Sequence, residues 1–317
     1  METELITTLA DGRFHSGQAL GELLGVSRAA VWKHLQKLQA LGLEVESVKG
    51  RGYRLPGGIE LLDKARIGDA LAPQVRKRLR EILIFQSLDS TNTRVASLGE
   101  EGAAVVCLAE QQSGGRGRRG RSWSSPFGRN IYLSLGWSFE GGAASLEGLS
   151  LAVGIALRRA LGNHPEVRLK WPNDLLFEGR KLAGVLIEMQ GDPSGHCQVV
   201  IGVGINLGMA GRERVEIDQP WADAQELGAF SRNGLVADVL NALVPALDEF
   251  SGRGFAAFHD EWQQGDACIG KPVRLLTPAL EIRGVARGVA ANGAICIEVD
   301  GLVREYNGGE ISLRTEP

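Results

Sequence analysis

The sequence has few cysteines and histidines, and neither type shows the spacing of a metal site. Its 4 cysteines are scattered with no Cys-x-x-Cys, and no two of its 5 histidines have metal-ligand spacing. We therefore expect reduced thiols and no structural zinc. No apolar run reaches the roughly 18 residues of a membrane span, and residues 1–4 are acidic, which argues against a signal peptide. These absences predict a cytoplasmic protein with no membrane contact.

A large excess of charge of either sign is also missing. The 35 lysines and arginines nearly balance the 38 acidic residues, which leaves a net charge of -3. This excludes a chain-wide attraction to nucleic acid, so any basic surface must be local. The chain has 317 residues, 44% of them hydrophobic and 23% charged, which is typical of a globular protein with about two or three domains.

One stretch is unusually rich in arginine and glycine. Residues 114–121 read Gly-Gly-Arg-Gly-Arg-Arg-Gly-Arg, and we call them the arginine loop. Like charges at this density repel, and the glycines leave the backbone free, so the empty loop is expected to be mobile. Guanidinium groups and glycine amides can enclose an anion. The composition therefore predicts a loop that becomes ordered when an acidic ligand binds.

The arginine loop does not open a dinucleotide-binding fold, although Gly115-x-Gly117-x-x-Gly120 has the spacing of that fingerprint. It follows a predicted strand at 103–109, as the fingerprint requires. However, a turn-rich segment and a second strand at 130–137 come next, where that fold needs a helix. The Gly-Lys-Ser/Thr of a P-loop is absent too. An unstructured basic or RNA-binding segment is the other interpretation, but strands on both sides place the loop inside a domain.

Residues 1–55 have the pattern of a winged helix-turn-helix. Ser16 precedes a short helix, Gly25 and Val26 form the turn, and Ser27 caps a longer helix with apolar residues at helical spacing. A hairpin follows at 44–48 and 52–55, with a basic tip at 49–52. Between residues 27 and 55, six lysines and arginines face two glutamates, a local charge of about +4.

This local charge favours binding to duplex DNA, because phosphate contacts supply affinity while a helix reads bases in the major groove. The alternative is a protein-docking module whose charged face is merely solvated. Our candidates are four residues on the second helix and two on the wing: Arg28, Ala29, Trp32, Lys33, Lys49 and Arg51.

The central part of the chain begins after a predicted hinge at residues 56–58. A charged helical segment at 61–80 precedes a strand at 82–85, which ends in a run of small polar residues up to Asn92. Ser90 or Thr91 can cap a helix there and also contact a ligand that has both donors and acceptors. Residues 145–161 form an amphipathic helix that we assign to packing.

Two strand ends in this part carry polar side chains. Residues 167–174 run into a proline-broken corner that presents Lys170, Asn173 and Asp174, either as a plain surface turn or as part of a site. A hairpin tip at 178–180 then leads to the strand 181–189, so Lys181 begins beside that corner. In the strand 198–207, Gly202, Gly204 and Asn206 share one face, which leaves room for a ligand or for close helix packing.

The last part of the chain is all β. After leucine-rich helical residues at 235–262, short strands are predicted at 273–276, 282–289, 294–299, 302–306 and 310–314. We therefore predict an α+β protein with a winged helix-turn-helix at 1–58, a mixed α/β domain at 59–269 and a small SH3-like β-barrel at 270–317.

Taken together, these segments resemble the biotin protein ligases, specifically the bifunctional bacterial type that also represses the biotin operon. The resemblance covers nearly the whole chain. It is carried, in family order, by five motifs: Gly-Arg-Gly-Arg-Arg-Gly-Arg-Ser-Trp at 115–123, Lys-Trp-Pro-Asn-Asp at 170–174, Arg-Lys-Leu-Ala-Gly at 180–184, Gly-Val-Gly-Ile-Asn at 202–206 and Gly-Gly-Glu-Ile-Ser-Leu-Arg at 308–314. Each motif alone is weak, whereas the ordered set is specific.

The resemblance implies a reaction and roles for the residues named above. Biotin's carboxylate would attack the α-phosphate of ATP, and a carrier-protein lysine would then attack the resulting biotinyl-5′-adenylate. Catalytic roles are implied for Lys181, Arg116 and Arg118, and the biotin-binding set adds Ser90, Thr91, Asn92, Gln112 and Gly117. Nucleotide contacts are implied for Arg121, Trp123, Asn173, Asp174 and Asn206, with Mg²⁺ brought by ATP and Asp174 as its one candidate protein ligand.

The resemblance also implies partners. These are the biotin carboxyl carrier protein of acetyl-CoA carboxylase, operator DNA and a second copy of the chain when adenylate is bound, with the adenylate as co-repressor. Two alternatives stay open at this point. A lipoate ligase would share the catalytic fold, and a ligand-sensing repressor would bind the small molecule without catalysis.

Overall fold

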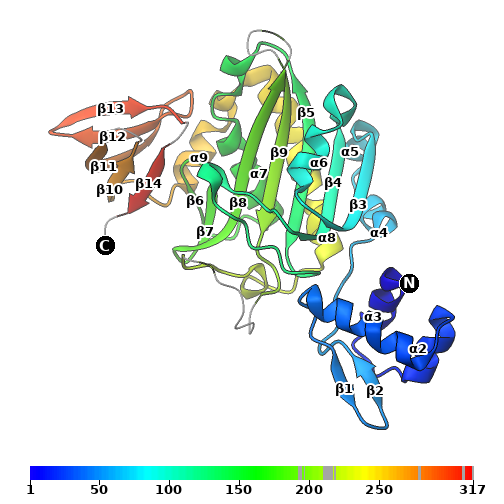
Figure 1. Ribbon diagram of the computed structural model, residues 1–317. Coiled ribbons are helices and arrows are strands. Elements are labelled where there is room, and N and C mark those ends of the chain that lie inside the picture. Colours follow the sequence, from blue (N-terminus) through cyan, green and yellow to red (C-terminus); the bar gives the residue numbers. More distant parts are fainter. Residues whose placement is uncertain are drawn as a thin grey trace.

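The fold is organised around a seven-stranded sheet that separates a helical N-terminal part from a C-terminal all-β part (Figure 1). The computed structural model describes residues 1–191, 195, 197–209, 217, 219–277, 280–308 and 311–315. Within these ranges, no helix is both long and apolar enough to cross a membrane.

The N-terminal part is the winged helix-turn-helix that the sequence predicts. Its elements are α1 (Glu2–Leu9), α2 (Gly17–Leu24), α3 (Arg28–Ala40), β1 (Glu46–Val48) and β2 (Gly52–Arg54). Ser16 caps α2 and Ser27 caps α3, each accepting a hydrogen bond from a backbone amide of the first turn. The apolar stripe of α3 is buried against α1 and α2 in a small core of its own.

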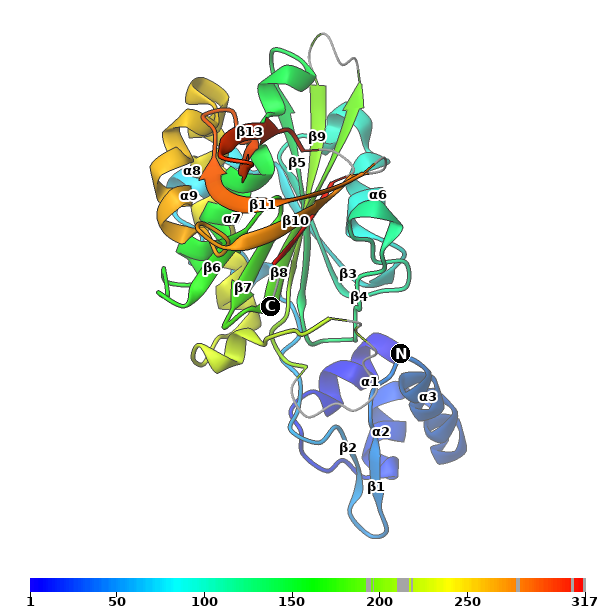
Figure 2. The same ribbon diagram turned by 90° about the vertical axis from the view of Figure 1, so that its left-hand side faces the viewer.

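The central sheet has the order β3-β4-β5-β9-β8-β7-β6, and only the pair β3–β4 is parallel. Its strands are β3 (Glu81–Leu88), β4 (Val105–Gln112), β5 (Ile131–Phe139), β6 (Val167–Lys170), β7 (Asp174–Phe177), β8 (Arg180–Gly191) and β9 (Cys197–Ile205). Helices α7 (Leu149–Ala160), α8 (Arg232–Arg253) and α9 (His259–Gly265) lie on one face, and α6 (Thr91–Ala96) lies on the other (Figure 2).

Alternation in β9 decides which face becomes core. Val199, Ile201, Val203 and Ile205 belong to the large hydrophobic core with α7 and α8, as the sequence predicts. Gly202 and Gly204 face the opposite side, toward α6 and the arginine loop. The face that carries α6 is therefore only partly covered by helices, and the polar strand ends gather there.

The predicted helix at 61–80 is wrong, because the structure has two short helices instead. α4 (Lys64–Ala70) ends before Leu71, and α5 (Pro73–Arg78) begins at a proline. Pro73 has no amide hydrogen to continue a helix and forces Ala72 into an extended conformation, so the break falls at this point. The helical residues at 235–262 likewise divide into α8 and α9 around Gly254.

The C-terminal part is a five-stranded antiparallel sheet in the order β13-β12-β11-β10-β14. The strands are β10 (Pro272–Leu276), β11 (Glu281–Val289), β12 (Ile295–Val299), β13 (Leu302–Tyr306) and β14 (Ser312–Thr315). The predicted small all-β unit is confirmed, although the last strand begins later than predicted. Gly309 and Glu310 of the predicted terminal motif lie outside the described residues.

Candidate active site and DNA-binding surface

One pocket collects nearly all the small-ligand residues that the sequence predicts. It lies between the arginine loop, the glycine face of the sheet and β14, and its empty volume is about 1060 Å³ with the open mouth included. The predicted residues that line it are Ser90, Thr91, Asn92, Gln112, Arg116, Gly117, Arg118, Arg121, Trp123, Asn173, Asp174 and Lys181. Asn206 lies in an adjoining cavity that shares Arg121, Trp123 and Lys181 with this pocket.

A buried polar corner closes one end of the pocket. Ser90 caps α6, and the side-chain oxygen Oε1 of Gln112 accepts hydrogen bonds from the Thr91 backbone amide at 2.8 Å and the Thr91 hydroxyl at 3.0 Å. The Ser134 hydroxyl lies 2.7 Å from Thr91 Oγ1 and 2.5 Å from Asn92 Oδ1. Ser134 is fully buried and supports the site through Thr91 and Asn92. The sequence analysis missed this supporting residue, and its signal was a polar residue at the middle of an apolar strand.

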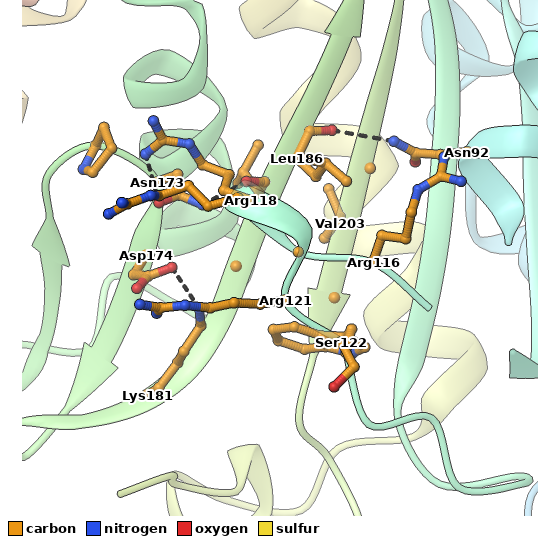
Figure 3. A pocket seen from close by; sticks show the side chains of 18 of the residues that line it. Asn92, Arg116, Arg118, Arg121, Ser122, Asn173, Asp174, Lys181, Leu186 and Val203 are labelled. Carbon is orange, nitrogen blue, oxygen red and sulfur yellow. Dashed lines mark hydrogen bonds and ion pairs between the residues drawn. The ribbon is translucent and has the colours of Figure 1, made fainter. Parts of the chain in front are cut away.

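The arginine loop is a narrow hairpin over the sheet. Gly117 donates its amide to Arg121 oxygen at 2.7 Å, and Trp123 donates to Gly115 oxygen at 2.8 Å. A side chain at Gly115 would press against backbone and side-chain atoms of Trp123 and Ser125. Arg116 and Arg118 point to opposite ends of the pocket, where Arg116 contacts Glu188 and Arg118 contacts Asn173 (Figure 3).

The opposite end of the pocket holds a lysine and a carboxylate. Lys181 Nζ lies 2.7 Å from Asp174 Oδ1 and 5.4 Å from the centre of the Trp123 ring. The Arg118 guanidinium donates to Asn173 Oδ1 at 3.4 Å, and the Asn173 amide nitrogen donates to Val185 oxygen at 2.7 Å. The proline corner and the start of β8 therefore form one cluster, as the sequence analysis expected of Lys181.

The glycines of β9 serve the protein's own side chains. A Cβ added at Gly204 would lie 2.5 Å from the Trp123 ring, and one at Gly202 would overlap the Asn92 amide. Both glycines also line the pocket, as expected of a face that leaves room for a ligand. They let Trp123 and Asn92 lie close against the sheet.

The pocket is strongly cationic. Its described lining includes seven lysine and arginine side chains and a single carboxylate, that of Asp174; the cations are Arg116, Arg118, Arg119, Arg121, Lys170, Lys181 and Arg314. Burial lowers the pKa of the Lys170 amine, and Asp174 opposes that shift. Such a surplus of positive charge in a partly closed pocket favours a polyanionic ligand.

The described residues hold no group of three or more histidine, cysteine, aspartate and glutamate side chains that could bind a metal by themselves. Asp174 supplies one carboxylate to the pocket and Asn173 adds an amide oxygen. Mg²⁺ commonly binds through one or two carboxylates together with substrate phosphates. This donor set therefore fits a Mg²⁺ that arrives with a nucleotide.

The six predicted DNA-binding residues are all exposed on the N-terminal part. Arg28, Ala29, Trp32 and Lys33 are spaced along one face of α3, and Trp32 is 53% exposed. On the wing, the Arg51 guanidinium stacks 4.2 Å from the centre of the Phe14 ring. The sequence analysis did not identify Phe14 as a contact of Arg51, because nothing in its local pattern sets it apart.

Comparisons with known proteins cover all three parts of the chain. Residues 84–206 match the Biotin/lipoate A/B protein ligase family, residues 2–54 match an HTH domain, and residues 268–314 match the Biotin protein ligase C terminal domain.

Full-length relatives and solved structures agree with these matches. Bifunctional ligase/repressor BirA of Escherichia coli is 43% identical over 98% of this chain and 97% of its own length, and the Salmonella typhimurium protein of the same name is 44% identical over 98% of this chain and 97% of its own. The biotin protein ligase of Aquifex aeolicus in complex with biotin and ATP superimposes with a TM-score of 0.65 at 28% identity, covering 75% of this chain and 100% of its own. The chain therefore belongs to the biotin protein ligases, in the bifunctional ligase/repressor branch of that family.

Proposed function

We propose that this chain activates biotin with ATP and transfers it to a lysine of the biotin carboxyl carrier protein of acetyl-CoA carboxylase. The observation that carries the proposal is one pocket with a neutral polar corner at one end and a dense cluster of cations at the other. Biotin has an uncharged ring system with hydrogen-bonding groups and a distant carboxylate, and ATP supplies the remaining negative charge. The pocket offers complementary groups in that order.

The first step joins two anions, so neutralising their repulsion is the main task of the site. The biotin carboxylate oxygen attacks the α-phosphorus, the bond from that phosphorus to the bridging oxygen breaks, and pyrophosphate leaves with those electrons. Lys181, beside Asp174 at the cationic end of the pocket, would contact both the carboxylate and the α-phosphate. Arg118 and Arg121 would meet the phosphates, with Arg116 placed toward the biotin end.

The remaining roles follow from position. Ser90, Thr91, Asn92 and Gln112 would hold the biotin ring system, with Gly117 close over it. Trp123 would cover the adenine, while Asn173, Asp174 and Asn206 would orient the nucleotide. A Mg²⁺ held by the nucleotide phosphates, with Asp174 as a protein ligand, would supply additional positive charge at the leaving group.

In the second step the amine of a carrier lysine attacks the biotinyl carbonyl carbon, and AMP leaves as an amide forms. The mixed anhydride must survive until that amine arrives. The hairpin over the pocket supports this requirement, because it limits the access of water to the bound intermediate.

A labelling assay tests the ligase proposal. The protein is incubated with ATP, Mg²⁺ and a biotin carboxyl carrier domain, with either biotin or lipoate, and the carrier is probed with streptavidin or an antibody against lipoyl-lysine. We expect biotin to be transferred and lipoate not. Lipoate transfer would favour a lipoate ligase, and ligand binding without transfer would favour a non-enzymatic sensor.

We propose in addition that the chain represses transcription as a homodimer with the adenylate as co-repressor. Two copies related by two-fold symmetry would present two α3 helices to half-sites spaced by whole turns of DNA. The basic wing and the exposed face of α3 support this role. Footprinting on the promoter of the biotin genes should show protection that requires biotin and ATP; absence of such protection would leave a ligase alone.

The domain boundaries at residues 58 and 269 remain part of this proposal. The first separates the DNA-binding unit from the ligase unit, and the second separates the ligase unit from the C-terminal sheet. The HTH match that ends at residue 54 and the C-terminal match that begins at residue 268 support these limits.

A further inference from the structure

Glu188 belongs neither to the polar corner of the pocket nor to the arginine loop, yet its side chain connects the two. It follows Gly184 and Leu186 on the pocket face of β8, opposite Val200 of β9. Its carboxylate accepts a hydrogen bond from Asn92 Nδ2 at 2.7 Å, and Arg116 Nη2 lies 3.2 Å and 3.3 Å from its two oxygens. One carboxylate therefore joins the polar corner to the arginine loop; Figure 3 labels Asn92 and Arg116, the two residues that it connects.

The contact with Asn92 fixes the orientation of a buried amide. A carboxylate can only accept hydrogen bonds, so the Asn92 nitrogen must face Glu188 and the Asn92 oxygen must face Ser134, 2.5 Å away. Asn92 is 4% exposed and lies over the bare Gly202. An amide held from both sides in this way offers a ligand one fixed pattern of donors and acceptors.

The contact with Arg116 fixes the arginine loop. Arg116 is bridged to Ser122 within the hairpin, and Trp123 follows directly. On the other side of the pocket the hairpin is held by Arg118 and Asn173. The loop is thus fastened at both sides, with Glu188 as its anchor on the side of the polar corner.

We propose that Glu188 is a positioning residue for the ligase reaction, which latches the arginine loop over the pocket through Arg116 and orients Asn92 beneath it. The inference rests on the proposed ligase function. Arg116 then mainly holds the arginine loop in place, and the anions are bound by Arg118, Arg121 and Lys181. The consequence is kinetic, because a latched loop slows the escape of the adenylate before the carrier arrives.

The decisive measurement is the rate at which bound adenylate leaves the full-length protein. The enzyme is loaded with labelled biotin and ATP, freed of excess substrate and chased with unlabelled biotin. Glu188→Gln keeps an oxygen for Asn92 but loses the ion pair, and we expect release about fivefold faster. Glu188→Leu also removes the acceptor for Asn92, and we expect release more than tenfold faster together with a raised KM for biotin.

A double-mutant cycle separates a latch from a general structural effect. Arg116→Gln and Glu188→Gln should each speed release, and the double variant should release no faster than either single variant. Glu249→Gln, which breaks an exposed pair with Arg253 on α8, is the matched control and should leave release unchanged.

Several outcomes would overturn the proposal. Release at the parental rate from Glu188→Gln would do so, and so would additive effects in the cycle or an equal effect of Glu249→Gln. A parent protein that forms no adenylate at all would refute the proposed ligase function instead, so the two failures can be told apart.

Discussion

At the scale of single residues, the pair formed by Lys181 and Asp174 is the most consequential contact of the site. Both side chains are largely buried, with 17% and 21% of their surfaces exposed, and their atoms lie 2.7 Å apart. A lysine held in this way keeps a defined position beside the Trp123 ring. Its loss would remove the cation that pairs with the Asp174 carboxylate in a pocket that must bind anions.

We therefore expect Lys181→Ala to lower adenylate formation at least about a hundredfold while the protein stays folded. The change both removes a positive charge and exposes a negative one in the same pocket. Pyrophosphate release measures it, and Lys64→Ala, at an exposed pair with Glu81, is the control. Parental rates of release in Lys181→Ala would contradict the assigned role.

Lys170 gives the site a dependence on pH. Burial is the main cause that lowers the pKa of its amine, with Arg314 and Lys181 acting in the same direction and Asp174 and Cys268 opposing. Anionic nucleotides bind better to the charged amine. Nucleotide affinity should therefore fall as the pH rises toward the ordinary lysine pKa of 10.5, by roughly tenfold overall.

Stability should change with the opposite sign over the same range. The unfolded chain holds this proton more tightly than the folded one, so the free energy of unfolding gains a contribution as the pH rises from the lowered pKa to the ordinary one. The effect on nucleotide affinity is measured by titrating ATP binding against pH in the parent and in Lys170→Met. An equal pH dependence in both proteins would show that another group is responsible.

Residues inside compact motifs could be predicted from the sequence, and residues that act across the fold could not. Ser90, Thr91, Asn173 and Lys181 stand at strand ends, where local pattern places polar groups. Glu188 lies 72 residues from its partner Arg116. Its role depends on the register of β8 against β9, which no local spacing reveals.

At the scale of elements, the glycine face of β9 is what brings the arginine loop onto the sheet. Trp123 can lie this close to the sheet only because Gly204 has no side chain, and Gly184 of β8 stands beside the same ring. The ring in turn contacts Lys181. A side chain added at Gly204 would therefore shift the Trp123 ring and, through it, Lys181 at the nucleotide end of the pocket.

We expect Gly204→Ala to displace Trp123, because the new Cβ would lie 2.5 Å from its ring. The KM for ATP should rise about tenfold, and the free energy of unfolding should fall by about 1–3 kcal/mol. Kinetics and denaturant unfolding measure both. Gly68→Ala in α4 is the control, since no atom lies within 4 Å of its new Cβ, and it should be neutral or slightly stabilising. Equal effects of the two substitutions would argue against a specific contact.

Elements with strong periodicity were predictable, and the interruptions were not. The caps at Ser16 and Ser27, the alternation of β9 and the five short strands of the C-terminal sheet follow from local rules. The prediction of a single helix at 61–80 is wrong because it gave more weight to the composition of the segment than to its proline. The backbone requirement of Pro73 decides the structure instead.

At the scale of the whole molecule, the end of β4 connects three parts of the chain. The Glu110 carboxylate accepts a hydrogen bond from the Leu62 backbone amide at 2.6 Å. The Gln111 side-chain amide donates to the Leu41 backbone oxygen at 3.3 Å, and the Gln112 side chain accepts from the Thr91 backbone amide. Three consecutive residues thus contact the segment just before α4, the winged part and the ligand pocket. Glu110 is itself held by a buried ion pair with Arg232 at 2.6 Å.

The segment after the arginine loop makes a second connection of the same kind. Trp123 lines the pocket, whereas Phe127, four residues later, is 3% exposed and packs into the small core of the winged part together with Ile59. A loop fixed by the adenylate should therefore reduce the freedom of the winged part, which couples the ligand pocket to the DNA-binding unit.

We expect Phe127→Ala to loosen the winged part alone. Truncating a buried phenylalanine costs about 3–5 kcal/mol, and a core this small has little stability to spare. Hydrogen exchange should therefore become at least about a hundredfold faster at amides of α1–α3 while those of β5 and β9 keep their parental rates. Phe127→Leu, which retains a large apolar side chain, should change exchange by less than about tenfold.

The same experiment reports on the link to the pocket. Adding biotin and ATP should slow exchange in α1–α3 of the parent, because the ordered loop holds Phe127 in place, and Phe127→Ala should lose most of that protection. If β5 and β9 were destabilised equally, Phe127 would belong to the core of the central sheet. If ligands protected α1–α3 equally in both proteins, the signal would have to pass through Gln111 and the chain between β2 and α4, and not through the segment that contains Phe127.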